Sequence, residues 1–327
     1  MNGTTKDALP KLPGHDGPGV QVHLLDGGSF STATLSFLHH GAPPELFRLY
    51  DWCFLIFHRP SGRYVLWDLG CSHDESLYTP WVKKIMLPSA RPVGPRKPVA
   101  TQLEELGVKA DQIDSVLFSH AHWDHCRPIS DEFPNAKALF GPGTKEFCSP
   151  GNLENGEPDV DIEWDGRWFG SPKHVTETWS EFDGDWVPFG VFDRAIDFFG
   201  DGSLWVIDAP GHMPGNLCAA VRLEGSQEWV LLGSDCCHSQ ALLREKEDIA
   251  LYDLPTGETA AYLHKDLPAA RITIDKIRLA ESKYGMHIAL AHDATWLVSQ
   301  HDPVLMSLVD DDKRGIWLDR VAQGERP

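Results

Sequence analysis

The stretch His120-Ala121-His122-Trp123-Asp124-His125 places three imidazoles and one carboxylate within six residues. It follows the apolar run 113–118, which predicts a short buried strand that delivers the cluster. Polar groups this dense at the end of a strand cannot all find backbone partners. Alternation places His120 and His122 on the same side, so their ring nitrogens can converge on one cation at about 2.0–2.1 Å. We therefore predict a metal site here, with the carboxylate and the third imidazole pointing to a neighbouring position.

The same arrangement recurs at three later strand ends. Apolar runs at 204–207, 229–232 and 287–290 lead into His212, Asp235 and His292, respectively. One tetrahedral catalytic metal needs three protein ligands and an open position for water, so seven candidate ligands predict two divalent metal ions. Histidine and carboxylate ligands favour Zn²⁺ and are also compatible with Mn, Fe and Co.

Strands and helices are interleaved along the chain, as in layered α/β folds. The other predicted elements are a strand at 20–25, a hairpin of 53–57 and 63–67 turning at Pro60-Ser61-Gly62, a helix at 99–106 closed by Gly107, and a helix whose apolar face contains Ile274, Ile277, Leu279 and Tyr284.

The predicted domain organisation is a flexible N-terminal tail at 1–19 and a single domain at 20–327. The tail is polar, rich in Gly and Pro, and lacks the pattern of a secretory signal. Residues 149–186 look like an insertion that carries four tryptophans, Trp164, Trp168, Trp179 and Trp186. The insertion is either a surface excursion held by aromatic anchors or a wall of a substrate pocket.

Composition excludes several classes of partner. The net charge is −19, from 29 Lys and Arg against 48 Asp and Glu, so nucleic acid and acidic membrane surfaces are poor candidates. No apolar run is long enough to span a bilayer. The seven cysteines form no repeating framework, which predicts buried, reduced thiols and a cytoplasmic location. The sequence is compatible with an oligomer and does not determine the oligomeric state.

Taken together, these motifs resemble the metallo-β-lactamase superfamily, and most closely its N-acyl-homoserine lactonase-like branch. The matching features, in the same order, are Asp68 in Trp67-Asp68-Leu69-Gly70, the six-residue cluster, the turn Pro210-Gly211-His212, Asp235, and the late pair His292-Asp293. The resemblance implies an α/β fold, an αβ/βα sandwich with the metals at one edge of its two sheets. It also implies a ligand set, in which the first metal is held by His120, His122 and His212, the second by Asp124, His125 and His292, and Asp235 bridges them.

Two such ions can share a water molecule, lower its pKa toward about 7 and present hydroxide to a carbonyl. We therefore expect a hydrolase that opens a cyclic ester or amide, a lactone or lactam, by metal-bound hydroxide. Asp124 is either a proton shuttle or only a metal ligand. His238 stands where the lactonase branch commonly has a tyrosine that bonds the substrate carbonyl, and it either takes that catalytic role or is structural.

The substrate and two alternative functions remain open at this level. The tryptophan-rich insertion would suit a resemblance to fungal γ-lactamases that open benzoxazolinone-type rings, as well as aromatic lactones. A thioesterase of the glyoxalase II type needs basic residues for its substrate, and Lys283, Lys313 and Arg314 are scattered. A metal-binding module without turnover is the other alternative. Cys126, Cys236 and Cys237 adjoin ligands, and we expect them to be buried rather than redox-active.

Overall fold

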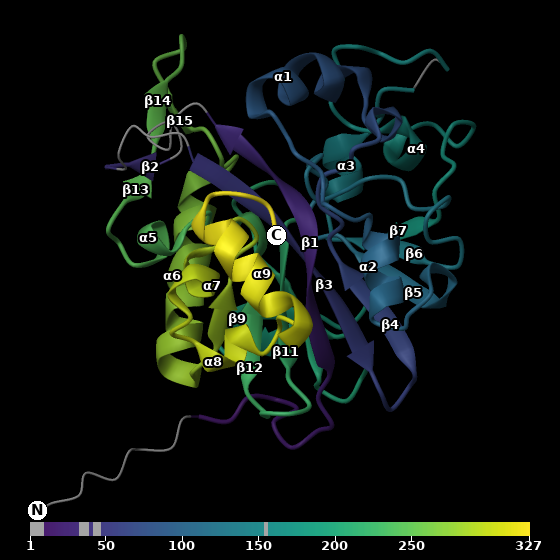
Figure 1. The fold of residues 1–327 in the computed structure, drawn as a ribbon. Coiled ribbons are helices and arrows are strands. Elements are labelled where there is room, and N and C mark those ends of the chain that lie inside the picture. Colours follow the sequence, from purple (N-terminus) through teal and green to yellow (C-terminus); the bar gives the residue numbers. More distant parts are fainter. Residues whose placement is uncertain (1–9, 33–38, 42–46, 154–155) are drawn as a thin grey trace, which may run out of the picture.

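The protein is described by a computed structural model over residues 10–32, 39–41, 47–153 and 156–327 (Figure 1). Within these residues the chain forms two six-stranded sheets. In spatial order, the first sheet contains β1 (Gln21–Thr32), β3 (Phe47–His58), β4 (Arg63–Trp67), β5 (Ile113–Leu117), β6 (Lys137–Phe140) and β7 (Trp179–Glu181). The second contains β16 (His287–Ala289), β12 (Trp229–Leu232), β11 (Leu217–Arg222), β10 (Leu204–Asp208), β9 (Phe192–Asp197) and β8 (Val187–Phe189).

Two small ribbons and the helices complete the described part of the fold. The ribbons pair β2 (His39–His40) with β13 (Asp248–Ile249), and β14 (Leu251–Asp253) with β15 (Thr259–Ala261). The α-helices are α1 (Leu87–Ala90), α2 (Val99–Glu105), α3 (Thr144–Cys148), α4 (Gly166–Phe169), α5 (Gln240–Leu243), α6 (Leu267–Tyr284), α7 (Thr295–Ser299), α8 (Pro303–Met306) and α9 (Asp311–Ala322). The other helical segments are the 3₁₀ turns η2 (Glu75–Leu77), η4 (Ala110–Gln112) and η5 (Ser234–Cys236) and the π-helical turn η3 (Val82–Met86).

The two sheets pack face to face, and helices cover their outer faces (Figure 1). In the buried strand β12, successive side chains point to opposite faces of the sheet and so pack into two different apolar clusters. Val230 and Leu232 enter the core between the sheets, while Trp229 and Leu231 join the cluster beneath α6. On the other side, α2 packs on the outer face of the first sheet. The predicted αβ/βα sandwich is therefore confirmed.

Helix α6 illustrates both a confirmed prediction and an error. Its N-terminus is capped by Asp266, whose carboxylate accepts a hydrogen bond from the Ala269 N–H, and it ends at Gly285 in the left-handed conformation. Ile274 and Ile277 are buried as predicted. Leu279, predicted on the same face, is 48% exposed, because two residues along a helix correspond to about 200° of rotation.

The N-terminal segment differs from the predicted flexible tail where it is described. Residues 10–19 lie against the body of the fold, with Leu12 buried and Gly14 in close contact with Gly202. Arg222 donates a hydrogen bond to the carbonyl of His15, which holds this segment to β11. The apolar side chain of Leu12 and the small Gly14 make this docking possible. Residues 1–9 of the predicted tail lie outside the described residues.

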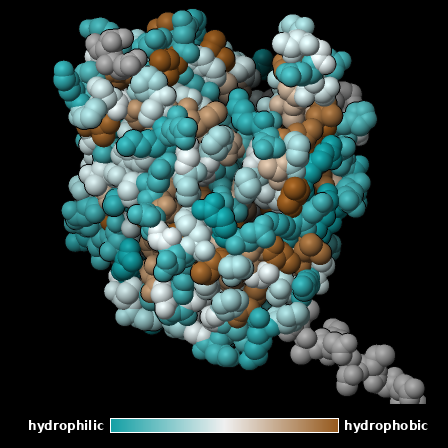
Figure 2. Space-filling view, turned by 180° about the vertical axis from the view of Figure 1, so that it is seen from behind, coloured by the Kyte–Doolittle hydropathy of each residue, from teal (hydrophilic) through white to brown (hydrophobic). Residues whose placement is uncertain are grey.

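Two surface properties complete the description. Seen from behind, hydrophilic residues cover much of the molecule, and hydrophobic ones are scattered among them (Figure 2). Among the described residues, no helix combines the length and apolarity needed to cross a membrane. All seven cysteines are buried and none forms a disulfide, so the predicted burial of Cys126, Cys236 and Cys237 is confirmed.

Candidate metal centre

The loops that follow four strands meet at one edge of the two sheets. They are the loops after β5, β10, β12 and β16, and they contain all seven candidate ligands. The ligand atoms form two groups, in each of which they lie within 4.8 Å of one another. One group is His120, His122, His212 and Asp235, and the other is Asp124, His125, Asp235 and His292. Asp235 alone belongs to both of these groups, and it reaches them from the turn directly after β12.

The turn that carries His212 is positioned by the start of α6. The backbone N–H groups of Lys265 and Asp266 donate to the carbonyls of His212 and Gly211, each at 3.0 Å. Gly211 has φ +131°, and a Cβ there would lie 2.3 Å from the Cα of Ala270. Only glycine therefore allows the turn to approach the helix this closely.

In the first group, the His122 Nδ1 lies 2.9 Å from both the His120 Nε2 and the His212 Nε2. Burial lowers the pKa of His122 to about 3 and the pKa values of His120 and His212 well below their usual value. These rings are therefore neutral. A single N–H on the His122 Nδ1 could donate a hydrogen bond to only one of the two Nε2 atoms that it faces. A cation at the centre would accept the lone pairs of all three rings, so the residues fit a metal ion.

In three of the proposed histidine ligands, a hydrogen bond from Nδ1 turns the other ring nitrogen, Nε2, toward the metal centre. The Nδ1–H of His120 donates to the Ser119 Oγ at 3.0 Å, that of His125 to the Asp68 Oδ2 at 3.0 Å, and that of His292 to the Tyr50 carbonyl at 2.6 Å. In a neutral ring, each bond leaves a lone pair on Nε2. This is the tautomer that a metal ligand requires.

In the second group, the Asp235 Oδ1 lies 2.9 Å from the His292 Nε2 and 3.2 Å from the His125 Nε2. The Asp124 Oδ2 lies 3.6 Å and 3.7 Å from the same two nitrogens. The other oxygen of Asp235 faces the first group, 3.5 Å from the His212 Nε2. Asp235 is thus placed between the two groups, as a bridging ligand would be.

The carboxylates set the charge of the second group. Burial disfavours a charge on His125 and His292, but Asp235, helped by Asp124 at His125 and by Asp51 at His292, raises the pKa of both rings well above the usual value. Burial raises the pKa of Asp124 to about 7. Without a cation, the rings of His125 and His292 are therefore protonated and positively charged. Metal binding would displace one proton from each ring.

Asp68 orients the ligand loop after β5 through hydrogen bonds to Ser119 and His125, on the side away from the metal ligand atoms. It adopts the left-handed conformation (φ 56°), and its carboxylate accepts hydrogen bonds from the Ser119 N–H and Oγ–H, each at 2.7 Å, besides the one from His125. An asparagine offers a single acceptor oxygen, so we expect Asp68→Asn to weaken metal binding about 10–100-fold. Competition with a chelator would measure the change.

The matched control for this prediction is Asp114→Asn. The Asp114 carboxylate accepts a hydrogen bond from the Tyr64 N–H at the ends of β4 and β5 that lie away from the metal ligands. The variant should therefore leave the metal affinity unchanged. An affinity of Asp68→Asn within twofold of the parent chain would contradict the orienting role.

Sequence reasoning missed three residues at the site. Asp51 lies 3.2 Å from the His292 Nδ1 through its Oδ1, and its Oδ2 accepts a hydrogen bond from the Cys71 Sγ. A carboxylate inside the apolar, aromatic run of β3 was a readable signal for it. His264 is buried beside the proposed ligand His212, and His39 is buried near His238; as lone histidines in a loop and a short strand they carry no such signal.

The predicted residue His238 lies beside the metal ligands. Its ring stacks on His292, with centroids 5.5 Å apart and planes at 16°, and its Nε2 lies 3.2 Å from the Asp235 Oδ2. Burial lowers the pKa of His238, so the ring is neutral and the Nε2–H donates to the Asp235 carboxylate. The remaining nitrogen, Nδ1, is buried and has no hydrogen-bond partner in the described part of the chain, and the catalytic role of His238 stays a prediction.

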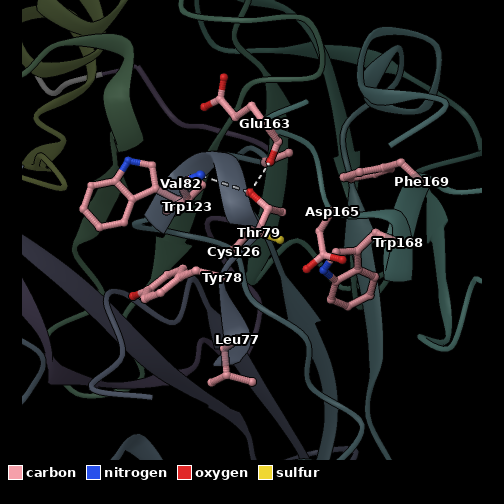
Figure 3. A pocket seen from close by; sticks show the side chains of 11 residues that line it. Leu77, Tyr78, Thr79, Val82, Trp123, Cys126, Glu163, Asp165, Trp168 and Phe169 are labelled. Atoms are coloured by element: carbon pink, nitrogen blue, oxygen red, sulfur yellow. Dashed lines mark hydrogen bonds between the residues drawn. The ribbon is translucent and has the colours of Figure 1, made fainter. Parts of the chain in front are cut away.

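The tryptophans of the insertion take different positions. Trp164 stacks parallel to the ring of His122 at 5.9 Å and so faces the site. Trp168 is buried behind the ligand loop, where Figure 3 shows it with Phe169 on one side of a pocket and Trp123 with Tyr78 on the other. This cavity is about 30 Å³, far below the roughly 300–1,000 Å³ of ligand pockets. Trp168 is therefore an anchor and Trp164 a candidate wall of the site.

Comparisons with known proteins agree with this geometry. A family model described as the metallo-β-lactamase superfamily matches residues 48–127. The metallo-hydrolase mfmC of Annulohypoxylon moriforme is 30% identical over 88% of this chain and 84% of that protein. The gamma-lactamase MBL2 of Gibberella moniliformis is 32% identical over 53% of this chain and 70% of that protein. The cytochrome P450 monooxygenase mpaDE of Penicillium brevicompactum is 28% identical over 84% of this chain, which spans 34% of that protein.

Solved structures share the fold at low sequence identity. An N-acyl homoserine lactone hydrolase with the product N-hexanoyl-L-homoserine at its catalytic metal centre has a TM-score of 0.59 and 16% identity, over 84% of this chain and 94% of that one. The dizinc quorum-quenching lactonase AidC, also in complex with a product, has a TM-score of 0.52 and 16% identity, over 88% of this chain and 90% of that one.

Proposed function

The chain belongs to the metallo-β-lactamase superfamily and is a hydrolytic enzyme, and on that premise we propose that it opens a cyclic ester or amide at a binuclear metal centre. The observation that carries the proposal is the position of Asp235, which two groups of ligand atoms share. When bound, two divalent ions, for which Zn²⁺ is the favoured identity, supply Lewis acidity that acidifies a water molecule and polarises the substrate carbonyl.

The proposed ligand set follows the two groups. The first ion is held by His120, His122 and His212, the second by Asp124, His125 and His292, and Asp235 bridges them. Similarity to lactonases and gamma-lactamases supports a lactone or lactam as the substrate.

Asp124 is the proposed proton carrier. In the metal-free site burial raises the pKa of Asp124 to about 7, and bound cations would lower it again, so the carboxylate would be ionised and able to accept a proton. In this role the carboxylate accepts a proton from the attacking water and passes it to the ring heteroatom as the ring opens. The same carboxylate lies close enough to His125 and His292 to be a ligand of the second ion.

Space for a ring substrate lies beside the centre. A cavity of about 470 Å³ is lined by His238, by the proposed ligand His292 and by Tyr50, and its size is typical of small-molecule sites. Trp164 does not line this cavity but stacks against the proposed ligand His122. An indole ring there favours a flat, aromatic substrate, because aromatic faces pack well on one another.

Hydrolysis by the metal-loaded protein tests the proposal. The panel is an acyl-homoserine lactone, an aromatic lactone, a benzoxazolinone and a glutathione thioester. We expect ring opening of an aromatic lactone or lactam, which a chelator abolishes and added Zn²⁺ restores, together with two ions bound per chain. Turnover of the thioester alone, or a single bound ion with full activity, would contradict the proposal. Activity on the acyl-homoserine lactone alone would exclude the aromatic substrate.

A further inference from the structure

The cavity of about 470 Å³ beside the proposed ligand His292 has one arginine and no lysine among the described residues that line it. This arginine is Arg48, near the start of β3 and two residues before Tyr50, which lines the same cavity. Side chains two residues apart in a strand point to the same face of the sheet, so Arg48 and Tyr50 border the cavity side by side. Arg48 therefore makes one part of the cavity wall positively charged.

Two hydrogen bonds hold the guanidinium group of Arg48 in the cavity wall. Its Nε donates to the Gly324 carbonyl at 2.9 Å, and its Nη1 donates to the Ser29 Oγ at 2.8 Å. The third nitrogen, Nη2, has no hydrogen-bond partner among the residues that the structure describes, and the side chain forms no ion pair with them. The group is thus fixed in position, and the N–H bonds of Nη2 are available to an acceptor.

The two carboxylates that line the same cavity, Glu247 and Asp293, are engaged with other partners. The Glu247 Oε2 accepts a hydrogen bond from the His39 Nδ1 at 2.8 Å. The Asp293 carboxylate accepts hydrogen bonds from the N–H and the hydroxyl of Thr295, at 2.7 Å and 3.1 Å. No carboxylate in the described part of the cavity wall therefore neutralises the charge of Arg48.

The distance between Arg48 and the metal ligands suits a molecule of two rings. His292 lines the cavity, and its Nδ1–H donates to the Tyr50 carbonyl at 2.6 Å. Two residues of a strand correspond to about 7 Å, so Arg48 lies about that far along β3 from the residue that His292 contacts. A two-ring lactone with its carbonyl at the metal centre can therefore extend a substituent of the distant ring to Arg48.

We propose that Arg48 selects a ring substrate that carries a carboxylate, on the part of the molecule remote from the bond that is hydrolysed. A carboxylate offers lone pairs to the N–H bonds of Nη2, and its opposite charge strengthens the hydrogen bond. Partial burial of Arg48 strengthens this pair relative to one in open water. A neutral substituent lacks the charge, and an ammonium group would be repelled. The inference rests on the proposed function for the reaction and adds the charge of the substrate.

Three lactones and three variants test this charge preference. The lactones are dihydrocoumarin and its derivatives with one carboxylate or one aminomethyl group on the aromatic ring. Arg48→Gln removes the positive charge, and Arg48→Glu reverses it. The matched control is Arg96→Gln. Arg96 also holds the C-terminal segment, by hydrogen bonds to the Arg326 carbonyl at 3.3 Å and to the Glu325 Oε2 at 3.2 Å, but it does not line this cavity. All proteins are loaded with Zn²⁺, and the bound metal is measured for each.

We expect the parent chain and Arg96→Gln to have a higher kcat/KM for a carboxylated lactone than for dihydrocoumarin. In Arg48→Gln the ratio of these two values should fall about tenfold, the usual effect of one hydrogen bond to a charged group. In Arg48→Glu the aminomethyl lactone should become the better of the two charged substrates. Added salt should lower the ratio in the parent chain, because salt screens a partly exposed ion pair.

An unchanged ratio in Arg48→Gln would overturn the inference. Combined with an equal loss on all three lactones, it would make Arg48 only a support for the C-terminal segment. The same fall of the ratio in Arg96→Gln would also overturn the inference. A parent chain that prefers the aminomethyl lactone would overturn it as well, and would indicate Glu247 as the charged group that selects the substrate.

Failure of the proposed function would be visible separately. If the parent chain opens none of the lactones, the carboxylated lactone and dihydrocoumarin are titrated into the Zn²⁺-loaded proteins by calorimetry. Tighter binding of the carboxylated lactone to the parent chain and to Arg96→Gln, and not to Arg48→Gln, would uphold the carboxylate site without turnover. Absent binding, or equal binding of both lactones to the parent chain, would overturn it.

Discussion

Replacement of His122 by alanine is expected to abolish turnover and to lower the bound metal from two ions per chain. The His122 Nδ1 is the atom within 2.9 Å of both other imidazoles of the first group. Without it, the first ion keeps two rings and a share of Asp235. Loss of a residue that only orients a ligand costs about 10–100-fold in metal affinity or activity, so loss of a ligand should exceed about 100-fold. Elemental analysis alongside kcat/KM would measure both effects.

The control for this variant is Cys236→Ala, one residue from Asp235 in sequence. The Cys236 Sγ contacts the Cys218 Sγ at 3.2 Å and accepts a hydrogen bond from the Asn216 Nδ2 at 3.1 Å, and it belongs to neither ligand group. Cys236→Ala should retain both ions. Two bound ions in His122→Ala, with more than a tenth of the parent activity, would remove His122 from the proposed ligand set.

Replacement of Trp52 by alanine is expected to lower the free energy of unfolding by about 3–5 kcal/mol, the usual cost of truncating a buried aromatic side chain. The Trp52 ring is 1% exposed in the core between the sheets. It stacks on Tyr50 at 5.0 Å and on Trp317 of α9 at 6.4 Å, so it joins the C-terminal helix to β3. Against a typical stability of about 5–15 kcal/mol, the loss would unfold a large share of the molecules on mild denaturation.

Urea unfolding of the metal-free proteins measures this effect, because bound metal adds stability by mass action. The control is Ile316→Ala, next to Trp317 on α9 but 55% exposed, which should change the free energy of unfolding by less than about 0.5 kcal/mol. The Trp52 indole N–H also donates to the carbonyl of Asp293 at 3.0 Å, beside the proposed ligand His292. A loss below about 1 kcal/mol in Trp52→Ala would mean that this core rearranges to fill the space.

The predictions from sequence were most reliable where the signal is local. The hairpin of β3 and β4, helix α2 and the strands before each ligand loop were predicted from periodicity and turn residues, and all are present. Leu279 was misplaced, because it lies two residues, or about 200° of rotation, from the buried Ile277. The docking of residues 10–19 was also missed, because Leu12 gains its burial from elements more than a hundred residues away.

The sequence by itself determined the chemistry, since strand-end histidines and aspartates in a recognisable order predict a metal centre and a hydrolase of this superfamily. Only the tertiary structure decided what surrounds that centre. It placed Asp51 behind His292, stacked His238 on His292, and brought His264 beside His212. The physical reason is that the chemical type of a metal ligand depends only on its own side chain. Its tautomer and its neighbours depend on contacts between segments that are far apart along the chain.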